Sequence, residues 1–116
     1  MKDPFILVRH ILDAIERIEL YTNDVDKSSE FEKNFMISNA VMRNITIIGE
    51  ASKKIPDDLK DGLPQIPWKK ITGMRNRLIH EYFIVDLETV WNVVEIDLPE
   101  LKLLLIQVLK SKQRDN

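Results

Sequence analysis

Residues 28–54, SSEFEKNFMISNAVMRNITIIGEASKK, decide the fold class of this chain. Apolar side chains recur there at spacings of three and four residues, which is the period of an amphipathic helix and not the alternation of a strand. We therefore predict one long helix from Ser28 or Ser29 to about Lys54, the central element of a helical bundle. Its inward side chains are expected to be Phe31, Phe35, Ile37, Val41, Ile45 and Ile48.

The same spacing continues on both sides of this stretch. A first helix should start after Asp3 and fade near Tyr21, and a third should run from Trp68 to about Tyr82 after a proline-containing connector. Asp86 can cap a fourth helix, and Pro99 favours a break before a fifth. Residues 110–116 are expected to fray. The predicted fold class is all-α, an up-down bundle of four to five helices.

Length and composition favour one domain, residues 1–116, because 116 residues are close to the commonest domain size. Charges are scattered through the first twenty residues, so no signal peptide is predicted, and no apolar run reaches membrane-spanning length. We expect a cytoplasmic protein with no membrane partner. The chain has no cysteine and two distant histidines, so neither a metal site nor a cofactor is predicted.

Cations gather in one segment of a mildly acidic chain. Residues 63–80 hold Lys69, Lys70, Arg75 and Arg77 with no acid, whereas the rest of the chain has 13 cations and 19 acids. A net charge of −2 argues against a protein that coats nucleic acid, but a local basic segment can bind RNA phosphates. Trp68 is a possible base-stacking platform beside it. The alternative is an ordinary solvated helix face.

Arg75 and His80 are the residues here that could cleave RNA without a metal. Such cleavage needs a base for the ribose 2′-hydroxyl, an acid for the leaving 5′-oxygen and a cation for the phosphorus centre. On a regular helix the two residues lie about 140° apart, whereas Asn76 shares the face of His80. We therefore favour a homodimer that brings two third helices together. The alternative for His80 is a surface or capping residue.

Gly49 and Glu50 form a second candidate group, in the middle of the long helix. A mid-helix glycine costs about 1 kcal/mol relative to alanine, so Gly49 should permit the close approach of another helix. Glu50 would then lie near that contact, where it could orient His80 or Arg75. The alternative is that Glu50 pairs with Arg43 as surface or interface charges.

Residues 75–82, RNRLIHEY, resemble the R-x4-H-x-Y signature of HepT-like toxins, a branch of the HEPN superfamily of small helical RNA-binding and RNA-cleaving domains. Residues 47–51, IIGEA, are similar to a block on the long helix of that family. Trp91 together with residues 98–101, LPEL, is similar to its C-terminal pattern. The resemblance spans essentially the whole chain.

The resemblance implies a homodimeric, metal-independent endoribonuclease, the toxin of a type VII toxin–antitoxin system. It implies that Arg75 and His80 are catalytic, and that a minimal nucleotidyltransferase antitoxin silences the toxin by transferring AMP to Tyr82. Two alternatives remain: a catalytically weak nucleotide- or RNA-binding subunit that regulates such a partner, and a purely structural helical partner. For Tyr82 alone, the alternative is an aromatic side chain that packs the helix end.

Overall fold

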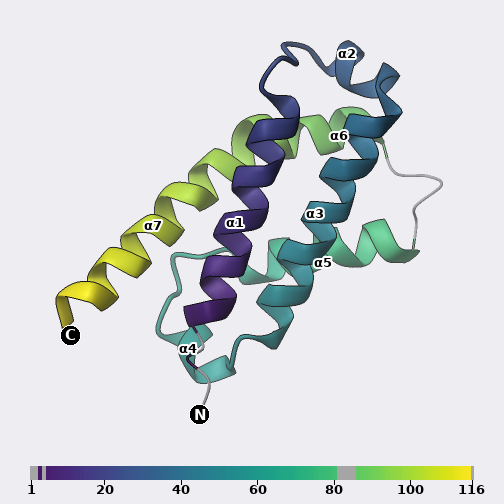
Figure 1. Cartoon of the computed structure of the whole chain (residues 1–116). Coiled ribbons are helices and arrows are strands. Elements are labelled where there is room, and N and C mark those ends of the chain that lie inside the picture. The colour runs from purple at the N-terminus through teal and green to yellow at the C-terminus, as the bar shows by residue number, and fades with distance from the viewer. Residues whose placement is uncertain (1–2, 4, 81–85, 116) are drawn as a thin grey trace.

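The computed structural model describes residues 3, 5–80 and 86–115, including all their side chains except those of residues 79, 80 and 113–115. Every regular element in these residues is a helix, so the predicted all-α class is confirmed. Helix α1 (Phe5–Thr22) and helix α3 (Phe35–Lys54) lie side by side and antiparallel, and α5 (Trp68–His80) crosses the C-terminal half of α3 (Figure 1). No helix in the described part of the chain is long and apolar enough to span a membrane.

The core lies where α1, α3 and the C-terminal helices meet. Aspartate 3 starts α1 as predicted, since its Oδ1 accepts a hydrogen bond of 2.9 Å from the Phe5 amide. The inward stripe of α3 is buried at Val41, Ile45 and Ile48, each at most 2% exposed. Phe35 is 69% exposed, so its predicted place in the core is wrong.

The predicted long helix is divided in two at Asn34. Helix α2 (Ser28–Lys33) ends there, and the Asn34 side chain caps α3 by accepting a hydrogen bond of 3.1 Å from the Ile37 amide. The break lets Phe31 turn toward helix α6 (Leu87–Asn92), where its ring centroid lies 5.2 Å from that of Trp91. An asparagine side chain that competes for backbone donors favours this cap over a continuous helix.

The C-terminal half also departs from the prediction. Instead of a break before Pro99, a π-helical turn (Val93–Asp97) joins α6 to helix α7 (Leu98–Asp115). Proline 99 lacks an amide donor, and the wider turn before it changes the hydrogen-bonding pattern at that point. A short helix that was not predicted, α4 (Asp57–Asp61), lies in the connector before α5.

The C-terminal residues do not fray as predicted. Helix α7 continues to Asp115, and the Lys112 ammonium bonds the Asp3 carboxylate and lies 4.5 Å from the centroid of the Phe5 ring. This ion pair therefore links α7 to the residue that starts α1.

Candidate functional site

The Arg75 guanidinium is held from two sides where α5 crosses α3. Its Nε and Nη2 donate to Oε1 of Glu50 at 3.0 and 2.5 Å, and its Nη1 donates to Oδ1 of Asn76 at 2.7 Å. The Arg75 side chain is only 15% exposed. These bonds use three of the five N–H groups of the guanidinium and fix its plane.

Gly49 makes this arrangement possible. A Cβ built on Gly49 would lie 2.1 Å from Cβ and 2.6 Å from Cγ of Arg75, well inside van der Waals contact. The prediction that this glycine permits the close approach of another helix is therefore confirmed, and the approaching group is the Arg75 stem. Glu50 pairs with Arg75 and not with Arg43, which is exposed on α3.

The ion pair also sets the protonation state of Glu50. The hydrogen bonds from Arg75 lower the pKa of the Glu50 carboxyl below its ordinary value of 4.5, although partial burial opposes them, and Lys53 and Lys54 add weaker attraction. Because the folded pKa is lowered, the stability that the pair contributes is fully present above pH 4.5. It is lost as the pH falls through the lowered value.

A Glu50→Gln variant should therefore differ from the wild type in a pH-dependent way. At pH 7 the variant lacks the ion pair and should unfold at a lower denaturant concentration. At pH 3, which lies below the ordinary pKa of 4.5, part of this stabilisation is already lost, so the difference should shrink. Denaturant titrations at the two pH values measure this, and an equal difference at both would contradict the proposed charge pairing.

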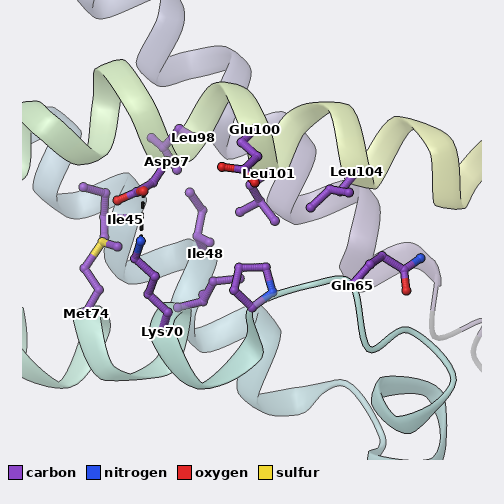
Figure 2. Close-up of a pocket in the computed structure, with 12 residues that line it drawn as sticks. Ile45, Ile48, Gln65, Lys70, Met74, Asp97, Leu98, Glu100, Leu101 and Leu104 are labelled. Carbon is purple, nitrogen blue, oxygen red and sulfur yellow. Dashed lines mark hydrogen bonds and ion pairs between the residues drawn. The ribbon is translucent and has the colours of Figure 1, made fainter.

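The predicted RNA-binding cations of α5 have different surroundings. Nζ of Lys70 donates to Oδ1 of Asp97 at 2.9 Å, across a pocket of about 190 Å³ between α3, α5 and α7 (Figure 2). The wall of this pocket is mainly apolar, with Ile48 and Leu101 pointing into it (Figure 2). Lys69 and Arg77 are exposed on α5. The Lys70 side chain thus links α5 to the π-helical turn.

Trp68 is half-buried at the start of α5. Its Nε1 donates to the Leu63 carbonyl oxygen at 3.1 Å, and Nζ of Lys60 lies 5.9 Å from the ring centroid. The ring is therefore fixed in place, and Lys60 lies over one of its faces.

Two predicted site residues cannot be placed in full. His80 ends α5, but its side chain lies outside the described part of the structure, as does all of Tyr82. Among the described residues, no group of three or more histidine, aspartate or glutamate side chains is arranged to hold a metal ion. Gly73 was not singled out from the sequence. It is a glycine in the middle of a predicted helix, the same pattern that pointed to Gly49.

Comparison with known proteins gives consistent results. Residues 11–108 match the family described as Ribonuclease HepT-like. A "Gamma-glutamylcyclotransferase and putative RNase" of Methanocaldococcus jannaschii is 40% identical over 98% of this chain, which spans only 51% of that relative. A "Probable ribonuclease HepT" of Thermococcus cleftensis is 43% identical over 79% of this chain and 83% of its own length. A "Putative RNase" of Caldanaerobacter subterraneus is 33% identical over 97% of this chain and 100% of its own length. No solved structure matches the chain.

Proposed function

Because this chain belongs to the Ribonuclease HepT-like family, we propose that it cleaves RNA without a metal, with Arg75 and His80 as the catalytic residues. The observation that carries the proposal is the anchored Arg75 guanidinium. Glu50 and Asn76 fix its orientation, and one N–H on each Nη is left for a phosphate oxygen. Such a preorganised donor stabilises charge that develops at phosphorus without having to reorient during the reaction.

The proposed reaction is an internal transfer at phosphorus. The ribose 2′-oxygen attacks the adjacent phosphorus as its proton passes to a base, and the 5′-oxygen leaves with a proton from an acid. The products are a 2′,3′-cyclic phosphate and a 5′-hydroxyl. Neutral His80 can take the first proton and protonated His80 can give the second. A homodimer that brings two α5 helices to one cleft would supply both forms.

An RNA cleavage assay in excess EDTA tests this proposal. The purified chain should still cut a mixed-sequence RNA and leave cyclic phosphate ends. The same strand with 2′-deoxyribose at the mapped cleavage position should not be cut there, because the attacking oxygen is missing. No cleavage under any condition would overturn the proposal, and RNA binding without cleavage would favour a regulatory RNA-binding subunit.

We extend the proposal to regulation as a toxin. A minimal nucleotidyltransferase antitoxin would transfer AMP from ATP to the Tyr82 hydroxyl oxygen, releasing pyrophosphate. Tyr82 lies two residues after His80 in sequence, so the added phosphate would bring negative charge close to a site meant for an RNA phosphate. Mass spectrometry after co-expression should find AMP on Tyr82, and an unmodified Tyr82 beside an active partner would contradict this extension.

A further inference from the structure

Gly73 lies inside α5, and no packing contact within the described chain explains why a glycine stands there. A Cβ built on Gly73 would meet nothing within 4 Å, in contrast to Gly49. A glycine inside a helix costs about 1 kcal/mol relative to alanine. Since no contact among the described residues requires the missing side chain, we attribute the glycine to another molecule that comes close to the helix backbone there.

Gly73 lies on a ridge between two surface grooves. One groove, of about 830 Å³, is lined by residues of α4 and α5, including Trp68 and Asn76. The other, of about 560 Å³, is lined by residues of α5, α6 and the π-helical turn, including Arg77. Both grooves include Gly73 and Lys70. A chain-like ligand that occupies both grooves would cross α5 at Gly73.

The charges around the ridge favour a polyanion. Lys69 and Arg77 lie four residues before and after Gly73, and α5 has no acidic residue. Lys70, which also pairs with Asp97, lies three residues before Gly73. Residues three and four apart share a helix face, so these cations flank the glycine. The acids of both grooves lie on other elements or between them, namely Asp57, Asp61, Asp86 and Asp97. They would repel phosphates and so confine a polyanion to the α5 ridge.

The ridge also leads to the proposed catalytic arginine. Asn76 lines the larger groove and is three residues after Gly73 on the same side of α5. Its Oδ1 accepts the 2.7 Å hydrogen bond from Nη1 of Arg75. A strand that lies over Gly73 can therefore reach Asn76, whose side chain contacts the guanidinium end of Arg75.

We propose that a single-stranded RNA segment crosses α5 at Gly73, with its sugar–phosphate backbone against the helix between Lys69 and Arg77. The strand continues past Asn76 to Arg75. Unpaired bases can enter the grooves on either side, which the bases of a duplex cannot do. A second copy of the chain seated on Gly73 itself fits less well, because symmetry would bring Lys69 and Arg77 of the two copies together. The proposed dimer would meet nearer the His80 end of α5. The inference rests on the proposed function for the identity of the strand.

Binding of a short, unstructured RNA with 2′-O-methyl riboses tests the inference, because such a strand cannot be cleaved. Gly73→Ala and Gly73→Gln should both raise the melting temperature, since each favours the helix and meets no neighbour. Gly73→Gln should nevertheless weaken RNA binding, measured by fluorescence anisotropy, by about tenfold, the loss expected when a close contact is blocked. The Gly73→Ala variant should lie between the wild type and Gly73→Gln.

Two matched lysine variants test whether Lys69 contacts an RNA phosphate. Lys69→Gln should reduce the slope of log affinity against log salt by about 0.7, the value for one phosphate contact on a single strand. Lys110→Gln removes the same charge from an exposed position on α7 and should leave the slope unchanged.

The outcomes separate this inference from the proposed function. Wild-type affinity of folded Gly73→Gln would overturn the inference, even if the wild type cleaves RNA. A change in oligomeric state by sedimentation, with unchanged RNA affinity per particle, would also overturn it and assign Gly73 to a second copy. If the wild type binds RNA without cutting it while Gly73→Gln binds weakly, the nuclease proposal fails and the strand path stands.

Discussion

Replacing Arg75 with alanine is expected to lower the rate of RNA cleavage by about 10²- to 10³-fold, the usual loss when one preorganised donor to a developing anion is removed. Stability should also fall modestly, because the variant loses the ion pair with Glu50 and the packing of a side chain that is only 15% exposed, whereas Glu50 itself is 40% exposed and can be solvated. Single-turnover cleavage rates and thermal melts measure the two effects.

Arg75→Lys should not restore the rate. A lysine ammonium is a point charge that cannot donate to Glu50, to Asn76 and to a phosphate in the planar arrangement of a guanidinium. Arg9→Ala, which removes an exposed arginine from α1, is the matched control and should cleave at the wild-type rate. Full activity of Arg75→Ala would remove Arg75 from the site.

The second large effect is expected from Gly49→Ala. The new Cβ would lie 2.1 Å from Cβ of Arg75, which is close to the α5 backbone and cannot swing away, so α3 and α5 must separate. Such overpacking costs typically about 1–3 kcal/mol, more than the gain of about 1 kcal/mol in helix propensity. Displacement of the Arg75 stem should also lower cleavage by about 10²-fold, as small misplacements of catalytic groups do.

Gly73→Ala is the matched control for this stability change. It makes the same chemical substitution on the same pair of helices, but in open space, so it should stabilise the fold while Gly49→Ala destabilises it. Denaturant unfolding of both variants gives the comparison. A Gly49→Ala variant as stable as the wild type would show that the α3–α5 contact is looser than the structure indicates.

The helical fold could be predicted from the sequence because apolar spacing reports directly on which face of a helix is buried. The division at Asn34 could not, since the flanking residues keep a helical period. An asparagine can cap a helix or lie inside one, and here the packing of Phe31 on Trp91 accompanies the cap. The π-helical turn before Pro99 was missed for a related reason. Proline signals a disturbed hydrogen-bond ladder but not how the chain accommodates it.

Part of the candidate site could also be predicted from local sequence patterns. Gly49 indicated a close helix contact because a glycine inside a helix is unfavourable unless packing requires it. Glu50 beside it contacts Arg75, one of the two residues that it was expected to orient. The Lys70–Asp97 pair joins residues 27 positions apart, and it depends on how α5 packs against the π-helical turn. No local pattern encodes that arrangement.

The central claim is that Arg75 and His80 act on the same RNA phosphate. Cleavage rates of Arg75→Ala, His80→Ala and the double variant test it most directly, with His10→Ala as control because His10 is the other histidine of the chain and is exposed on α1. We expect both single variants to lose most activity, His10→Ala to keep it, and the double variant to lose far less than the product of the two single losses. Wild-type cleavage by His80→Ala, or losses that multiply in the double variant, would contradict the claim.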